Sequence, residues 1–183
     1  ALQAIGLPSC DRSLFERLLR RYGDDPAVTF MLTHQGRMHP LIAQFPNECF
    51  YECRLRTVPL PHQTSQLPPA GDTTLSSLIA SRRTIFLPVK ADDDRQVPDK
   101  VNTAEADLIA ELVRLIYEQE KAQFDPADTL GIIVPYRAQI AALRSRIGRL
   151  GIPSLMDITI DTVERFQGSQ RRYIIYGFTV RRP

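Results

Sequence analysis

Two short segments, distant in the chain, place polar side chains among residues that make turns. The first is Gln35-Gly36-Arg37-Met38-His39-Pro40 and the second is Thr162-Val163-Glu164-Arg165-Phe166-Gln167-Gly168. Each follows an apolar run typical of a strand, and α/β proteins carry their functional loops at strand ends. The guanidinium of Arg37 could stabilise the charge that develops on a transferred phosphoryl group, or it could pair with a local acid and anchor its helix.

A third segment, Gly131–Gln139, has the composition of a strand that leads into a helix. Backbone N–H groups at the start of a helix, and hydroxyl groups beside them, hold phosphates without reading base identity. Pro135, Tyr136 and Arg137 open this helix and Thr162 ends a neighbouring strand, so all four are candidates for such contacts. The Tyr136 ring either stacks on a base or lies half-buried behind Pro135, and Arg137 either contacts a phosphate or lies in solvent.

The cysteines and histidines offer no metal site. Cys49 and Cys53 would share one face of a helix, but no nearby Cys or His completes a zinc pattern. We expect the cysteines, which include Cys10, to be reduced and buried. The three histidines are too scattered for a metal site, and no Gly-x-x-x-x-Gly-Lys-Ser/Thr loop or nucleophile elbow occurs.

Apolar spacing, capping residues and prolines predict the elements that position these segments. Around the first segment they predict a helix from a Ser13–Glu16 capping box to near Gly23, a buried strand over 27–33, a helix from Pro40 to about Cys49, and an irregular surface excursion over about 54–77. Around the others they predict a strand over 84–89, an acidic loop over 91–100, a helix capped by Asn102 and Glu105, a strand over 129–134, a helix from Tyr136 that Gly151 and Pro153 end, and strands over 158–163 and 173–179.

The inward faces of the two longer helices follow from the same spacing. The predicted inward residues are Ala106, Ile109, Val113, Ile116 and Tyr117 on one helix and Ile140, Leu143, Ile147 and Leu150 on the other. Strands that alternate with helices form a mostly parallel sheet covered by helices, so we predict a three-layer α/β domain over residues 1–183.

Composition narrows the class of protein without naming a partner. The 183 residues include 23 basic and 21 acidic ones, and a net charge of +2 does not demand nucleic acid. The basic excess is nearly all arginine, which suits phosphate contacts and a solvated surface equally well. No apolar stretch approaches the roughly 20 residues that cross a bilayer, and no signal peptide is visible. We therefore expect a protein without a membrane partner that is cytoplasmic or nucleoid-associated and not secreted.

Together the three segments resemble the motifs of superfamily 1B helicases, the branch of the nonsense-mediated-decay RNA helicase and the replication nuclease-helicase. Gln35–Pro40 is similar to the branch's Gln-Tyr-Arg-Met-His-Pro signature, Gly131–Gln139 to its next motif, and Thr162–Gly168 to its Thr-Val-Asp-x-Phe-Gln-Gly motif. Three ordered motifs are a stronger signal than any one alone. The resemblance covers nearly the whole chain.

The resemblance implies the second RecA-like (P-loop NTPase-type) lobe of an ATP-dependent DNA or RNA helicase, a lobe that lacks its own P-loop. ATP and Mg²⁺ would be held mainly by the first lobe of the same parent chain, and residues 1–183 would be a fragment truncated at both ends. The implied roles are catalysis by Arg37, nucleotide contacts by Gln35, Gly36, Arg37, Gly168 and Gln170, and contacts to single-stranded DNA or RNA by Pro135, Tyr136, Arg137, Thr162 and Gln167.

Four positions depart from the branch's pattern. Gly36 replaces the Tyr expected to pack on adenine, Gln170 replaces a Glu expected at the ribose, Arg172 replaces an Asp, and Val134 replaces a Thr. An amide can still hydrogen-bond a sugar hydroxyl, so the change at Gln170 is mild. The departures bear more on base selectivity than on the identity of the motor.

We therefore expect a second motor lobe that completes an ATP site and grips single-stranded nucleic acid. Alone it should not hydrolyse ATP, because nothing in it cradles the triphosphate. The alternative is a non-catalytic nucleic-acid-binding or scaffold domain derived from a helicase, which Gly36 and Gln170 favour. A stand-alone enzyme for small molecules would need a Gly-rich phosphate loop or a nucleophile elbow, and the sequence contains neither.

Overall fold

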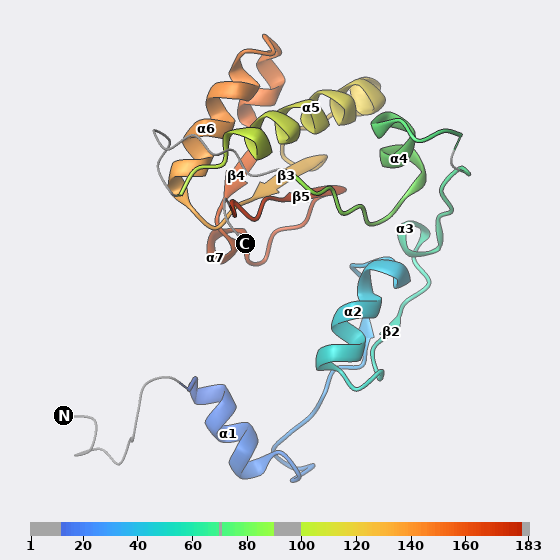
Figure 1. The fold of residues 1–183 in the computed structure, drawn as a ribbon. Helices are drawn as coiled ribbons and strands as arrows, with labels where there is room; N and C mark the ends of the chain where they lie inside the picture. The colour runs from blue at the N-terminus through green and yellow to red at the C-terminus, as the bar shows by residue number, and fades with distance from the viewer. Residues whose placement is uncertain (1–11, 70, 90–99, 181–183) are drawn as a thin grey trace, which may run out of the picture. The chain divides into compact units, whose positions relative to one another are not determined.

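The computed structural model describes residues 12–69, 71–89 and 100–180 and divides the chain into two compact units, residues 1–66 and 67–183 (Figure 1). In the first unit, α1 (Leu14–Tyr22) begins where the Ser13 hydroxyl accepts a hydrogen bond from the Glu16 N–H at 3.1 Å, and its C-cap is Gly23. The predicted start and end of this helix are confirmed. No residue of α1 is buried, and Phe15 is 74% exposed.

The first unit is a small α/β arrangement around two short parallel strands. β1 (His34–Gln35) pairs with β2 (Arg56–Thr57), and α2 (Pro40–Phe50) lies between them in sequence with Pro40 in its first turn, as predicted. The Asn47 side chain of α2 bonds the Leu55 N–H at 2.8 Å and the Leu55 carbonyl at 3.1 Å. This double contact ties the end of α2 to the start of β2.

The predicted buried strand over 27–33 is wrong. Only His34–Gln35 is a strand, and the apolar side chains of Val28, Phe30 and Leu32 are exposed. Asp25 explains the difference, because its side chain accepts from the Ala27 N–H at 2.9 Å and its carbonyl accepts from Val28 and Thr29. Such a local turn competes with an extended chain, and β2 pairs only with His34 and Gln35, which follow the run.

Two further expectations for this part of the chain need correction. The stretch 54–77 is ordered in places, because it contains β2, the one-turn helix α3 (Pro61–Thr64) and the start of α4 (Leu75–Ser81). Cys49 and Cys53 are free but exposed, so the prediction of burial is wrong for both. Cys49 lies in the last turn of α2, and Cys53 follows with a left-handed φ of 58°. Cys10 lies outside the described residues.

The second unit holds a three-stranded parallel sheet in the order β4-β3-β5. Its strands are β3 (Leu130–Ile133), β4 (Thr159–Asp161) and β5 (Tyr173–Tyr176), with Ile132 opposite both Ile160 and Ile175. The predicted central strand and the last two strands are confirmed. An α/β fold with parallel strands is thus confirmed as well.

Two helices cover one face of this sheet (Figure 1). α5 (Thr103–Glu120) begins where the Asn102 side chain accepts from the Glu105 N–H, as predicted, and α6 (Arg137–Gly148) ends three residues before Gly151. Their predicted inward residues are either buried or packed against the buried cluster. The remaining helical elements are short: a 3₁₀ turn over Lys121–Gln123, another over Pro153–Asp157, and α7 (Val163–Phe166).

Residues 84–89 alternate between half-buried and exposed side chains but form no strand. The predicted strand is therefore wrong, although Ile85 still packs against the core cluster. Pro88 lacks the N–H that a ladder needs, which disfavours pairing of this segment. Of the predicted acidic loop over 91–100, only Lys100 lies within the described residues. Among the described helices, none has both the length and the apolar character required to span a membrane.

Candidate functional site

The loop that carries Arg37 lies between the end of β1 and the start of α2 and is closed by a single side chain. Gln35 Oε1 accepts from the N–H groups of Arg37 at 2.9 Å and Met38 at 2.7 Å, while Gln35 Nε2 donates to the Met38 carbonyl at 2.7 Å. His39 is the N-cap of α2, and its Nδ1 accepts from the Leu41 N–H at 3.2 Å. Gln35 and His39 therefore shape the loop through backbone contacts.

The Arg37 side chain is exposed. Within the part of the chain that the structure describes, no acid lies in ion-pair distance of its guanidinium. The alternative in which Arg37 pairs with a local acid gains no support there. A guanidinium that is exposed on a closed loop can bind an external phosphate or carboxylate.

The space beside Gly36 is bordered by Leu60. A Cβ atom added at Gly36 would lie 3.3 Å from Leu60 Cδ1, and the Gly36 carbonyl lies 2.9 Å from His62 Nε2. Any side chain at position 36 would require Leu60 to shift slightly. Glycine at position 36 therefore leaves room for Leu60, in the segment that follows β2, to lie close to the loop.

The second group of candidates lies at the carboxyl edge of the three-stranded sheet. The Val134 N–H donates to the Asp161 carbonyl at 3.1 Å and the Gly177 N–H donates to the Ile133 carbonyl at 2.9 Å, so the chain beyond each strand stays in register. Pro135, Tyr136 and Arg137 are all exposed here.

The start of α6 has the features of a phosphate-binding helix end. Tyr136 is its N-cap, but its side chain caps no N–H group. Backbone N–H groups in such a first turn carry partial positive charge and point outward from the helix. The Tyr136 ring is 40% exposed, and Lys100 Nζ lies 5.7 Å from its centroid. A base or a phosphate could reach this surface.

At the end of β4, local hydrogen bonds already involve some of the polar groups predicted to bind nucleic acid. Thr162 is half-buried, and its N–H donates to Asp161 Oδ1 at 2.9 Å. The pKa of Glu164 is lowered, first by a hydrogen bond from its own N–H and then by one from the Thr162 hydroxyl. The Thr162 hydroxyl therefore already has the Glu164 carboxylate as a partner, and an external phosphate would be a second one.

The turn after α7 is formed as the sequence predicts. Gln167 has φ −55° and ψ 132°, Gly168 has φ 84°, and the Ser169 N–H donates to the Phe166 carbonyl at 3.0 Å. These values match a type II turn, whose third residue needs a positive φ and favours glycine. Phe166 is 6% exposed and lies in the core, whereas Gln167 is exposed.

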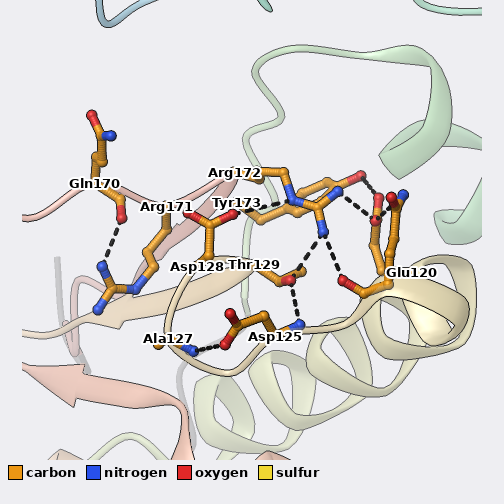
Figure 2. Close-up of polar contacts among 10 residues, drawn as sticks. Glu120, Asp125, Ala127, Asp128, Thr129, Gln170, Arg171, Arg172 and Tyr173 are labelled. Carbon is orange, nitrogen blue, oxygen red and sulfur yellow. Dashed lines mark hydrogen bonds and ion pairs between the residues drawn. The ribbon is translucent and has the colours of Figure 1, made fainter.

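Gln170 and Arg172 lead to the opposite edge of the sheet, where β3 and β5 begin (Figure 2). The Gln170 carbonyl accepts from Arg171 Nη1 at 2.6 Å, and its side chain is exposed. Arg172 Nη1 donates to Glu120 Oε2 at 2.7 Å, Arg172 Nη2 donates to Thr129 Oγ1 at 3.0 Å, and Tyr173 donates to Glu120 Oε1 at 2.8 Å. Arg172 therefore joins the end of α5 to the starts of two strands.

A buried polar cluster at the carboxyl edge escaped sequence analysis. Gln139 exchanges hydrogen bonds with the backbone N–H and carbonyl of Asn102 at 2.9 and 3.0 Å, and it donates to Glu105 Oε1 at 3.2 Å. Glu105 also accepts from the N–H groups of Phe178 and Thr179, both at 2.9 Å to Oε2. The capping signal identified Asn102 and Glu105 only as a helix start, and nothing in the sequence shows that Gln139 is buried beside them.

The predicted sites divide between the two units. The nucleotide candidates Gln35, Gly36 and Arg37 belong to the first unit, and Gly168 and Gln170 to the second. All five nucleic-acid candidates belong to the second unit, on the segments that follow β3 and β4. Over residues 12–69, 71–89 and 100–180, no group of three or more His, Cys, Asp or Glu side chains could hold a metal ion.

Comparisons with known proteins add the family. Residues 10–182 match the family described as AAA domain. The putative helicase mov-10-B.1 of Danio rerio is 31% identical over 196 residues, which cover 97% of this chain and 18% of that protein. An uncharacterized ATP-dependent helicase of Methanocaldococcus jannaschii is 27% identical over 173 residues, 91% of this chain and 24% of that protein. Helicase SEN1 of Saccharomyces cerevisiae is 26% identical over 171 residues, 90% of this chain and 7% of that protein.

The chain spans less than a quarter of the length of these curated relatives, with shares of 18%, 24% and 7%. The family match nevertheless includes all three motif segments, because it runs from residue 10 to residue 182.

Proposed function

The chain belongs to the AAA domain family that forms the C-terminal, RecA-like lobe of superfamily 1 helicases, and from this premise we propose that it completes the ATP site of a parent helicase and grips single-stranded DNA or RNA. In this proposal residues 1–183 form one lobe. The first lobe of the same parent chain is its partner and holds most of the ATP and Mg²⁺.

The observation that carries the proposal is the exposed Arg37 guanidinium on a loop closed by Gln35. ATP bound with Mg²⁺ supplies the phosphoryl group and its developing negative charge. Arg37 would donate paired hydrogen bonds to that charge, as guanidinium groups do at phosphoryl-transfer sites. Gln35, Gly36, Gly168 and Gln170 are the proposed accessory nucleotide contacts.

The carboxyl edge of the three-stranded sheet is the proposed nucleic-acid contact. The uncapped first turn of α6, with Pro135, Tyr136 and Arg137 exposed, can hold phosphates and stack one base. Thr162 and Gln167 would extend the contact from the end of β4. Such contacts are independent of base identity, which suits a motor that moves along any sequence.

Arg37→Ala in the parent helicase tests the ATP role. An arginine that stabilises the transition state is worth about 10³-fold or more in kcat, so we expect kcat to fall by about that factor with little change in KM for ATP. Arg20→Ala is the matched control, because Arg20 is exposed and pairs with Glu16 at 3.0 Å on α1. Residues 1–183 alone should show no ATPase activity stimulated by nucleic acid, and robust turnover by them would contradict the proposal.

A non-catalytic nucleic-acid-binding or scaffold domain is the second candidate. The glycine at position 36, with Leu60 beside it, favours this candidate because it leaves no aromatic side chain for an adenine at that position. The same assay separates the two functions. An ATPase of the parent protein that is indifferent to Arg37→Ala, together with retained binding of single strands, supports the scaffold role for this domain.

A further inference from the structure

We propose that Gln63 is a positioning residue that holds the Arg37 loop in place for the ATP role proposed above, on which this inference rests. Gln63 lies in α3, within the proline-rich stretch between β2 and α4, and it is 2% exposed. Only two of the described residues before position 67 are buried, Ala43 and Gln63. A buried amide in so small a unit points to a specific partner.

Both hydrogens of the Gln63 amide go to the loop. Nε2 donates to the Gln35 carbonyl at 3.0 Å and to the Met38 carbonyl at 2.9 Å. The two acceptors lie on either side of Gly36 and Arg37. One side chain therefore spans the residues that carry the guanidinium.

Each of these carbonyls also accepts a second hydrogen bond. The Gln35 carbonyl accepts from the Val58 N–H at 3.0 Å, and the Met38 carbonyl accepts from Gln35 Nε2 at 2.7 Å. Two-fold acceptance uses both lone pairs of a carbonyl oxygen. The loop backbone is thus held from inside by Gln35 and from outside by Gln63, while the Arg37 side chain stays exposed.

The orientation of the Gln63 amide follows from its partners. If its oxygen and nitrogen were exchanged, the oxygen would face two carbonyl oxygens, so only the observed orientation makes hydrogen bonds. Gln63 Oε1 has no hydrogen-bond partner among the described atoms. A buried acceptor without a partner is unfavourable. The Gln63 side chain therefore stabilises the loop through its N–H donors and not through its oxygen.

Local structure brings Gln63 to the loop. Pro61 occupies the first turn of α3 after an extended Leu60, and the N–H groups of Gln63 and Thr64 donate to the Leu60 carbonyl. This single turn directs Gln63 inward, while His62, which is exposed, reaches the Gly36 carbonyl at 2.9 Å. The stretch after β2 therefore serves as a clamp on the loop.

Hydrogen exchange in the 183-residue chain tests the clamp directly. Gln63→Met keeps the length and burial of the side chain but has no donors, and Gln63→Glu keeps the shape but faces the two carbonyls with acceptors only. We expect the amides of Arg37 and Met38 to exchange about tenfold faster in either variant, the size expected for losing one or two hydrogen bonds. Gln66→Met, at an exposed glutamine three residues away, is the control and should leave exchange unchanged.

ATPase kinetics in the parent helicase test the consequence. A displaced guanidinium weakens transition-state contacts more than ground-state binding, so we expect Gln63→Met to lower kcat about tenfold while KM for ATP stays within about twofold. Gln63→Glu provides the same test if the methionine variant folds poorly. Unchanged exchange at Arg37 and Met38 in the folded variants overturns the inference.

The two proposals fail in different ways. If Arg37→Ala lowers kcat but Gln63→Met does not, the inference fails and the proposed function stands. If Arg37→Ala leaves kcat unchanged, the proposed function fails, and hydrogen exchange alone then decides whether Gln63 holds the loop. A fall in kcat/KM that comes only from a raised KM would show a defect in ATP binding, and it would also overturn the positioning role.

Discussion

At the scale of single residues, the buried polar side chains bond mostly to backbone groups. Glu105 is 8% exposed, and every described contact of its two oxygens comes from a donor: the N–H groups of Phe178 and Thr179, the Thr179 hydroxyl and the Gln139 amide. Thr179 has a left-handed φ of 56°, a conformation that a non-glycine residue adopts only when its surroundings hold it. Position 105 therefore needs a side chain that only accepts hydrogen bonds.

We predict that Glu105→Gln destabilises the second unit although it changes no volume. The new amide would turn donors toward N–H groups and leave buried groups unpaired, at a cost of about 1–3 kcal/mol in the free energy of unfolding. Denaturant unfolding of the 183-residue chain measures this loss. Glu118→Gln on the same helix is the control, because its exposed ion pair with Arg114 contributes at most about 1 kcal/mol. Equal losses in the two variants would contradict a special role for Glu105.

Sequence reasoning reached some of these residues and missed others for a clear reason. The helix caps Ser13 and Asn102 and the turn at Gly168 carry local signals, since each contact joins residues within four positions. Arg37 lies in a contiguous motif that the sequence shows directly. Gln63 acts across 28 and 25 positions, and Gln139 across 37, so no local pattern reveals their partners. Side-chain bonds to a distant backbone become visible only in the folded chain.

At the scale of elements, the contact between β3 and α7 depends on a glycine, because Gly131 has no side chain to meet Phe166. A Cβ atom at Gly131 would lie 2.3 Å from Phe166 Cζ, closer than packed atoms can be, and 3.1 Å from Arg171 Cγ, a tight contact. We predict that Gly131→Ala lowers the free energy of unfolding by about 1–3 kcal/mol through overpacking.

Gly148→Ala, in the last turn of α6, is the matched control for this change. The nearest atom to its added Cβ is Met156 Sδ at 3.7 Å, so it should be neutral or stabilise by about 0.5–1 kcal/mol. Replacing Phe166 with leucine in the Gly131→Ala background should restore part of the loss. Thermal unfolding of the four proteins checks the series, and a Gly131→Ala midpoint equal to that of the wild type would contradict it.

The amino edge of the sheet predicts a specific dependence of stability on pH. Burial, followed by the hydrogen bond to Glu120, raises the pKa of Tyr173 from 10.0 to about 12. The folded chain then keeps a phenol proton that the unfolded chain loses, so stability is complete below about pH 10 and falls as the pH rises toward about 12. We expect the difference in unfolding free energy between wild type and Tyr173→Phe to shrink between about pH 10 and about pH 12.

Ultraviolet titration of the tyrosines gives an independent check on Tyr173. A phenol step near pH 12 should appear in the wild type and be absent in Tyr173→Phe. A wild type without this late step would show that the Glu120 contact is not maintained in solution.

Element types were easier to predict than element pairing. The run over 129–134 became a central strand because both neighbours supply a ladder, whereas the runs over 27–33 and 84–89 have strand-like composition but no ladder. In the first case Asp25 forms a competing turn, and in the second Pro88 removes a donor. Whether an apolar segment pairs depends on its neighbours in space, and periodicity contains no such information.

At the scale of the whole molecule, the two units differ in what holds them together. The buried hydrophobic cluster runs from Ile79 to Ile160 and lies entirely within residues 67–183. The described part of the first unit buries only Ala43 and Gln63 and relies on hydrogen bonds around the Arg37 loop. We therefore expect the proposed ATP role and the proposed nucleic-acid role to be separable by truncation.

Residues 67–183 should unfold cooperatively on their own and bind a single-stranded oligonucleotide within about threefold of the affinity of residues 1–183, because every nucleic-acid candidate lies in that unit. Fluorescence anisotropy measures the binding, which should weaken with salt as phosphate contacts require. Tyr136→Ala should weaken it about tenfold if the ring stacks on a base, whereas Phe86→Ala, at a more exposed aromatic outside the three motif segments, should not. Loss of binding on removal of residues 1–66 would place the nucleic-acid contact in the first unit.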